Sequence, residues 1–182
     1  IDAAAEEDLN VYYNEGADCV IYSGTKALEG PTSALVIGKK EFIKTLKNQS
    51  KGIGRVMKVG KENILGLTKA IELYVNKNKF TLDEQRERLK DFNGVLNGID
   101  GITSTCVQDA AGRAIIRALI SFDEYKLNIN ALEIAEKLKT GDVRIYTRDY
   151  RANEGKIEID IRDLSDEELE FILIRIREIV GK

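Results

Sequence analysis

The 182-residue sequence predicts an α/β region followed by a smaller α+β region. Near the N-terminus, two short β-favouring runs flank a glycine-bearing turn and precede a pattern of helical period, whereas the C-terminal part combines strand patterns with helical ones. Apolar residues make up 43% of the chain and proline occurs once, which is typical of a globular protein and excludes a disordered or collagen-like one.

The first region begins with two expected strands. One covers residues 18–22 and runs into the turn Ser23-Gly24-Thr25-Lys26, and the other covers residues 33–38, after Gly30-Pro31. From Lys61 to Val75, apolar residues recur at helical spacing, which predicts an amphipathic helix.

A domain boundary is expected at residues 76–80, just after this helix. Residues 1–76 then form one domain and residues 77–182 a small α+β domain. In the small domain, Thr81-Leu82-Asp83-Glu84 has the form of a capping box and predicts a helix that ends near Asn97.

The C-terminal part predicts a hairpin and a terminal helix. Residues 143–150 and 156–162 are strand-like and are joined by a loop at 153–155. In the second strand three isoleucines alternate with charged residues, which predicts one buried and one solvated face: Ile157, Ile159 and Ile161 against Glu158, Asp160 and Arg162. A second capping box at Ser165-Asp166-Glu167-Glu168 starts a helix with one apolar face.

The charge and the residue counts exclude several classes of function. Net charge is 28 − 31 = −3, so the chain has no general attraction to nucleic acid or to anionic lipid. Because the chain has no histidine, Ser-His-Asp triads, Cys-His pairs and imidazole-rich zinc sites are excluded, and we expect no metal site.

The two cysteines, Cys19 and Cys106, are too far apart for a CxxC motif, which favours a reduced, cytoplasmic compartment. We expect Cys106 to be a small buried apolar residue. No apolar run reaches the ~18 residues of a membrane helix. Since the sequence starts at Ile1 within a strand-like run, we expect it to be the C-terminal part of a longer protein.

The most informative pattern for chemistry is Ser23-Gly24-Thr25-Lys26, which places a hydroxyl and an amine three residues apart at the end of a strand. A desolvated lysine amine forms a Schiff base with an aldehyde, and a nearby hydroxyl binds the phosphate that the aldehyde carries, which is what pyridoxal phosphate requires. A carboxylate at Asp2 would pair with the pyridine nitrogen. The same residues are also typical of a solvated surface lysine and a turn-capping aspartate.

Four segments together resemble a known family, the selenocysteine-synthase-like branch of the fold-type I pyridoxal-phosphate enzymes. The resemblance is clearest from Asp2 to about Val75, and the segments are Asp2-Ala3-Ala4-Ala5, Gly16-Ala17-Asp18, residues 22–31 and residues 54–62. It implies that the chain is the end of a fold-type I cofactor domain followed by the small domain. The sequence departs from the family at Thr25 and Thr32, where glycine and glutamine are usual.

The resemblance also implies roles for single residues. Lys26 would carry the Schiff base, Asp2 would pair with the pyridine nitrogen and Ser23 would hold the phosphate. It favours Arg55 and Lys58, in the basic glycine-containing loop from Lys51 to Lys61, as a clamp for a phosphate or carboxylate that reaches a neighbouring subunit's site. The alternative for this loop is a solvated basic surface.

Fold-type I enzymes offer an arginine of the small domain to the substrate carboxylate, and Arg148 in the strand-like run 143–150 is the candidate. Arg113 and Arg117 are weaker candidates, since each would also suit a solvated helix face or an ion pair. Tyr12, Tyr13 and Tyr22 are expected to be packing residues.

The expected function is that of a pyridoxal-phosphate-dependent lyase or transferase, acting at the β-carbon of an amino-acid-like or phosphorylated small-molecule substrate. We expect a homo-oligomer, a dimer or larger. Selenium transfer to seryl-tRNA is the precedent within the family, but the acidic charge balance does not support tRNA binding. The alternative is a non-catalytic descendant that serves as a binding or assembly module.

Overall fold

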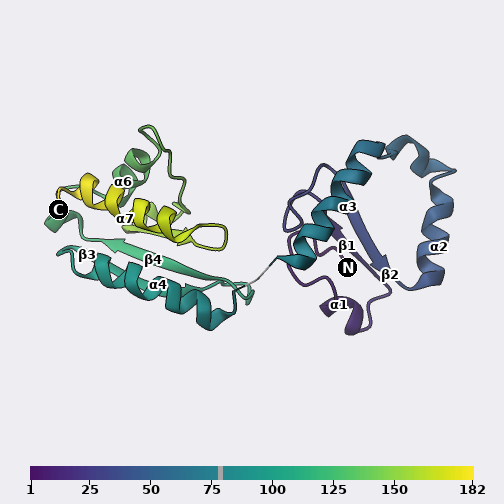
Figure 1. Ribbon diagram of the computed structural model, residues 1–182, viewed down its shortest axis with the longest axis horizontal. Helices are drawn as coiled ribbons and strands as arrows, with labels where there is room; N and C mark the ends of the chain where they lie inside the picture. The colour runs from purple at the N-terminus through teal and green to yellow at the C-terminus, as the bar shows by residue number, and fades with distance from the viewer. Residues whose placement is uncertain (78–79) are drawn as a thin grey trace. The chain divides into compact units, whose positions relative to one another are not determined.

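The computed structural model describes residues 1–77 and 80–182, and the chain divides after residue 78 into two compact units. The expected domain boundary, at residues 76–80, includes positions 78 and 79, which lie outside the described residues. Figure 1 shows the elements of each unit, and the two units are taken separately below.

The first unit is built around the antiparallel strands β1 (Cys19–Ser23) and β2 (Ala34–Gly38), paired from Cys19↔Gly38 to Ser23↔Ala34. Both expected strands are therefore confirmed to within one residue. The N-terminal segment runs parallel to β1 on its other side, with Asp2 bridged to Ile21. Helix α1 (Val11–Asn14) lies between that segment and β1 along the chain.

Three helical segments complete this unit: α2 (Lys40–Gln49), the 3₁₀ helix η1 (Ile53–Met57) and α3 (Lys61–Asn76). The structure confirms the helix expected at 61–75, whereas α2 was not predicted. Figure 1 shows α3 alongside the two strands. It packs on them through half-buried apolar residues, against a small core formed by Ala3, Val20, Tyr22 and Leu28.

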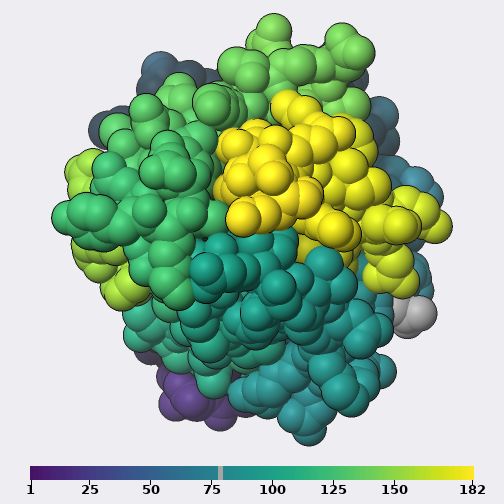
Figure 2. Space-filling model, turned by 90° about the vertical axis from the view of Figure 1, so that its left-hand side faces the viewer, coloured from purple at the N-terminus to yellow at the C-terminus, as the bar shows by residue number. Residues whose placement is uncertain are grey.

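The second unit is a three-stranded antiparallel sheet with helices. The strands are β3 (Ile102–Gln108), β4 (Ile116–Phe122) and β5 (Lys156–Asp160), in the order β3-β4-β5. The helical segments are α4 (Leu82–Asn97), α5 (Glu124–Leu127), α6 (Ala131–Leu138), η2 (Ala152–Glu154) and α7 (Asp166–Val180). Figure 2 shows α4 in teal and α7 in yellow side by side, in agreement with the contacts between them.

Both expected capping boxes are present. The Thr81 hydroxyl accepts from the Glu84 amide while the Glu84 carboxylate accepts from the Thr81 amide, and Ser165 and Glu168 do the same at the start of α7. These caps satisfy N–H groups that a helix leaves free at its start, so the helices begin where the sequence predicts. The isoleucines of β5 are buried in the main core, as expected.

The prediction of a strand at residues 143–150 is wrong. Only Arg148 pairs with the sheet, through a single bridge to Glu158. The Ile145 amide donates to the carbonyl of Leu138 at 2.9 Å, so this part of the chain is tied to the end of α6 and reaches β5 only at Arg148. The predicted solvated face of β5 is also wrong at Glu158, which is buried.

Three smaller expectations are corrected. Cys106, on β3, is exposed. Tyr13 is 40% exposed on the short helix α1, although Tyr22 is buried as expected. Of the two alternatives for Arg113 and Arg117, the helix face is wrong, because they lie in the β3–β4 turn and on β4, and the ion pair is confirmed, because both pair with Asp109.

Candidate functional site

The site residues predicted in the first unit lie around the C-terminal end of β1. Asp2 is paired with Ile21, and the Ser23 amide donates to the carbonyl of Ala4 at 3.1 Å. Because side chains alternate along strands and Val20 and Tyr22 are buried, Ile21 and Ser23 lie on the other face of β1. The structure therefore places Asp2 beside the middle of β1, and Ser23 and the loop that carries Lys26 follow at the end of the same strand.

The loop that joins β1 to β2, residues 24–33, is tightly folded; we call it the lysine loop. The Gly24 amide donates to the carbonyl of Ser33 at 2.9 Å, and the Glu29 amide donates to that of Lys26 at 2.9 Å. A Cβ on Gly24 would overlap the Ser33 hydroxyl and lie 3.0 Å from the backbone oxygen of Pro31, so this crowded turn favours glycine. These constraints hold the backbone of Lys26, whose side chain is exposed.

Helix α3 supports the lysine loop from behind. The Asn63 side-chain amide donates to the carbonyl of Thr32 at 2.7 Å. A Cβ on Gly66 would lie 2.9 Å from the Cγ of Pro31, so the helix backbone approaches the proline ring closely. Asn63 and Gly66 were not among the predicted residues, although a glycine inside a helical pattern is a signal for such a close approach.

Two hydroxyl groups stand together just before Lys26. The Ser23 Oγ accepts from the Thr25 amide at 3.3 Å and lies 3.1 Å from the Thr25 Oγ1. Thr25, one of the two positions at which the sequence departs from the family that it resembles, thus adds a second hydroxyl beside Ser23. Such a pair suits the oxygens of a phosphate group.

These side chains fit pyridoxal phosphate by their chemistry. The set contains an amine for the aldehyde, a carboxylate for the ring nitrogen and hydroxyls for the phosphate. Among the residues that the structure describes, neither Lys26 nor Asp2 has a hydrogen-bond or ion-pair partner for its side chain, and both are exposed. Both groups are therefore available to a ligand.

The other predicted residues lie apart from this group. Arg55 belongs to η1 and Lys58 follows it; both are exposed, and neither bonds to Asp2, Ser23 or Lys26. The neighbouring apolar side chains are also solvated, with Ile53 85% and Val56 87% exposed.

Arg148 belongs to the second unit, where it is paired within the chain. Its Nε donates to the Glu158 Oε2 at 3.2 Å, and its guanidinium lies over the Tyr150 ring at 5.3 Å. The Tyr150 hydroxyl donates to the Glu158 Oε1 at 2.7 Å, which explains how the carboxylate is accommodated in a buried position. The Arg148 side chain remains 44% exposed.

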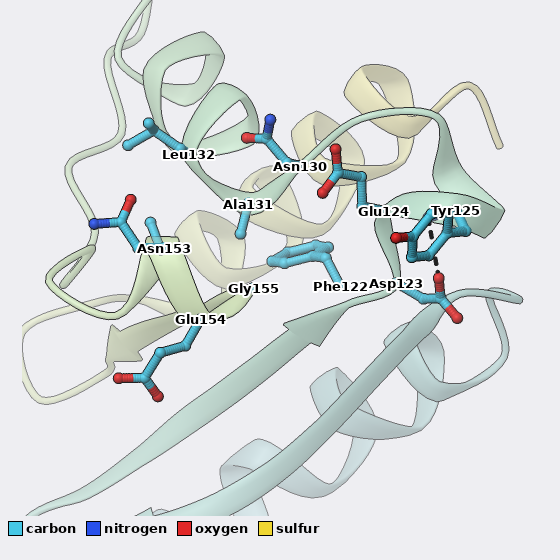
Figure 3. A pocket seen from close by; sticks show the side chains of 11 residues that line it. Phe122, Asp123, Glu124, Tyr125, Asn130, Ala131, Leu132, Asn153, Glu154 and Gly155 are labelled. Atoms are coloured by element: carbon cyan, nitrogen blue, oxygen red, sulfur yellow. Dashed lines mark hydrogen bonds between the residues drawn. The ribbon is translucent and has the colours of Figure 1, made fainter.

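The second unit also contains a pocket of about 630 Å³, drawn in Figure 3. Phe122 and Ala131 line it together with the η2 loop around Asn153, and none of the predicted site residues does. Within the described residues there is no cluster of three or more acidic or cysteine side chains that could hold a metal ion. The helices described are also all too short or too polar to cross a bilayer.

Comparison with known proteins decides the family. The sequence profile of the L-seryl-tRNA selenium transferase family matches residues 3–98, more than half of the chain. The chain belongs to this family. The match covers Ser23, Lys26 and the whole of α3, as the resemblance indicated.

Within and around the selenium transferase family, the chain resembles several named enzymes. It is 38% identical to the D-glucosaminate-6-phosphate ammonia lyase of Salmonella typhimurium over 98% of its own length and 48% of the relative's. It is 37% identical to the 5'-C-glycyluridine monooxygenase-decarboxylase of a Streptomyces species, over 99% of its own length and 45% of the relative's. The chain thus spans about half the length of these curated relatives.

Solved structures agree with the family assignment. The structure of D-glucosaminate-6-phosphate ammonia-lyase matches with a TM-score of 0.77 and 39% identity, over 99% of this chain and 48% of that one. Further matches at 13–18% identity, two of them solved with pyridoxal phosphate, show the fold alone. The fold is the C-terminal portion of a fold-type I pyridoxal-phosphate enzyme, as expected.

Proposed function

We propose that the protein carrying this chain is a pyridoxal-phosphate-dependent lyase or transferase that acts at the β-carbon of an amino-acid-like substrate. The observation that carries the proposal is that Asp2 pairs with β1 while Ser23 and the lysine loop follow at the end of that strand, with α3 packed against the loop. When bound, the cofactor would withdraw electrons from the substrate α-carbon.

Each residue of the group has a distinct task. The Lys26 amine would hold the cofactor by its aldehyde, and the same amine would take the proton from the substrate α-carbon. The Asp2 carboxylate keeps a proton on the pyridine nitrogen, through a charge-assisted hydrogen bond. The hydroxyls of Ser23 and Thr25 donate to the phosphate and fix the ring in place.

For the substrate, we propose a phosphorylated, amino-acid-like small molecule that loses ammonia. The support is the Salmonella relative, which is named as a lyase of D-glucosaminate 6-phosphate. In this proposal, Arg55 and Lys58 bind the phosphate or the carboxylate, and Arg148, whose side chain is 44% exposed, binds the carboxylate. A homo-oligomer and a cytoplasmic location complete the proposal.

The family name supports a second substrate, seryl-tRNA, for selenium transfer. A net charge of −3 argues against strong binding of a polyanion. Titration with tRNA at several salt concentrations separates the two: a steep fall in affinity with salt supports the tRNA substrate, and a flat, weak signal supports the small molecule.

The cofactor proposal is tested by absorbance. The full native polypeptide that carries this sequence, incubated with pyridoxal phosphate and dialysed, is expected to keep a visible absorption band. Lys26→Ala is expected to lose the band, whereas Lys44→Ala, which changes an exposed lysine of α2, is expected to keep it. A colourless wild-type protein would favour the binding-module alternative.

A further inference from the structure

The segment that follows Asp2 carries three consecutive acidic residues, Glu6, Glu7 and Asp8. The residues before these acidic ones are paired with β1, where the Ala3 amide donates to the Ile21 carbonyl at 2.9 Å. A turn follows, in which the Glu6 amide donates to the Ala3 carbonyl at 2.9 Å. Within the segment, the Asp8 carboxylate accepts from the backbone amides of Asn10 at 2.8 Å and Val11 at 3.0 Å. Like charges in sequence repel one another, so contacts from other elements add to its stability.

Two buried or half-buried phenols provide that support. The Tyr22 hydroxyl donates to the backbone carbonyl of Asp8 at 3.0 Å, and the Tyr74 hydroxyl donates to that of Glu7. Tyr22 lies on β1 next to Ile21, the partner of Asp2, and Tyr74 lies in the last turn of α3. The acidic segment is therefore fixed to both the strand and the helix of the site.

Both phenols remain donors over the working pH range. Burial raises the pKa of Tyr74 to about 12, and the nearby Glu7 carboxylate adds to the shift. Burial also raises the pKa of Tyr22, with a further contribution from Asp8. Neither hydroxyl gives up its proton near neutral pH, so the two hydrogen bonds persist there.

Helix α3 thus contacts both the lysine loop and the acidic segment that follows Asp2. Asn63, near its start, holds the lysine loop through the Thr32 carbonyl, and Tyr74, near its end, holds the segment that leaves Asp2. A helix of 16 residues is stiff, so it sets the separation of these two parts.

From these contacts we infer that Tyr74, with Tyr22, is a positioning residue that holds the Asp2 carboxylate in place for the cofactor ring. The inference rests on the proposed function, since it requires that Asp2 pairs with the pyridine nitrogen. If it holds, loss of the Tyr74 hydroxyl changes the binding and the absorption of the cofactor only when Asp2 is present.

The test is a double-mutant cycle on the full native polypeptide, with Tyr74→Phe, Asp2→Asn and the double variant. The readouts are the dissociation constant of pyridoxal phosphate and the pH dependence of the absorption of the bound cofactor. Tyr74→Phe alone is expected to weaken binding about threefold to tenfold, the worth of one hydrogen bond. In the Asp2→Asn background it is expected to change neither readout.

A matched control is Tyr13→Phe, which removes a hydroxyl from an exposed tyrosine of α1 in the same unit and is expected to change nothing. If Tyr74→Phe fails to fold, Tyr22→Phe takes its place in the cycle, with the same expectation.

Two results would overturn the inference while leaving the cofactor proposal intact. In one, Tyr74→Phe weakens the binding of pyridoxal phosphate equally in the wild-type and Asp2→Asn backgrounds, which would make the tyrosine a structural residue only. In the other, Asp2→Asn weakens the binding of pyridoxal phosphate and Tyr74→Phe has no effect on it. A wild-type protein that binds no pyridoxal phosphate would overturn both the inference and the proposed function.

Discussion

Gly66 of α3 and Pro31 of the lysine loop are in such close contact that a Cβ built on Gly66 would lie 2.9 Å from the proline Cγ. Glycine inside a helix costs about 1 kcal/mol relative to alanine, so its presence here needs a reason. The close contact supplies one, because it brings the helix backbone directly against the loop that carries Lys26.

Substituting Gly66 by alanine is therefore expected to lower the free energy of unfolding by about 1–3 kcal/mol, since the rigid ring cannot move aside easily. Gly94→Ala on α4 is the matched control, because a Cβ there meets nothing within 4 Å. It is expected to raise the free energy of unfolding by about 0.5–1 kcal/mol. Urea unfolding measures both, and stabilisation by both variants would contradict the close contact.

The ion pair between Asp109 and Arg117 is expected to matter for the stability of the second unit. Its two side chains are each 4% exposed and lie 2.9 Å apart, and Arg113 binds the same carboxylate. Asp109→Asn removes the charge that both arginines share and leaves Arg117 with Asp160 as its remaining carboxylate, so we expect a loss of about 3 kcal/mol. Asp83→Asn, which breaks an exposed pair with Arg86, is expected to cost at most about 0.5 kcal/mol.

The same carboxylate predicts the pH dependence of stability. Hydrogen bonds from Arg113, and after them those from Arg117, hold the pKa of Asp109 well below its usual range despite burial. A group whose pKa is lowered by folding stabilises the protein above its unfolded pKa of about 3.9 and loses that contribution as the pH falls below it. Unfolding measured from pH 7 to pH 2 should show the wild type losing its advantage over Asp109→Asn below about pH 4; a constant difference would refute this.

Ser23→Ala is expected to weaken the binding of pyridoxal phosphate about tenfold, the worth of one hydrogen bond to a charged group. Binding of pyridoxal, which has no phosphate, is expected to be unchanged. Comparing the two dissociation constants by absorbance titration isolates the phosphate contact. If both ligands weaken equally, Ser23 acts through the shape of the lysine loop instead.

For Arg148, we expect substitution by methionine to raise KM for a carboxylate substrate at least about tenfold and to leave the affinity for the cofactor unchanged. Arg151→Met is the control, because Arg151 pairs with the neighbouring Glu154 instead. Steady-state kinetics with the holoenzyme provides the comparison. A fall in kcat at constant KM would argue that Arg148 does not bind the substrate.

The parts of the fold that the sequence predicts are those with local causes. The capping boxes at Thr81 and Ser165 mark helix starts by bonds between residues three apart, and the alternation in β5 marks its buried isoleucines. Strands β3 and β4 were missed because polar residues of β3 and the buried Arg117 of β4 hide the apolar pattern.

The remaining errors have tertiary causes. Glu158 looks like a solvated residue in the sequence, yet it is buried because Arg148 and Tyr150, which lie eight or more positions away, satisfy both oxygens. Likewise, Tyr74 is 67 positions from Glu7, whose carbonyl accepts its hydrogen bond, and no local sequence pattern predicts such a contact. The motif Ser23-Gly24-Thr25-Lys26, by contrast, can be recognised from the sequence because its residues are contiguous.

The most direct test of the account is borohydride reduction of the full native polypeptide in the presence of pyridoxal phosphate, followed by peptide mass mapping. Reduction makes the link between the cofactor and a lysine permanent. We expect one stoichiometric adduct, on Lys26. Adducts spread over surface lysines, or no adduct at all, would contradict it.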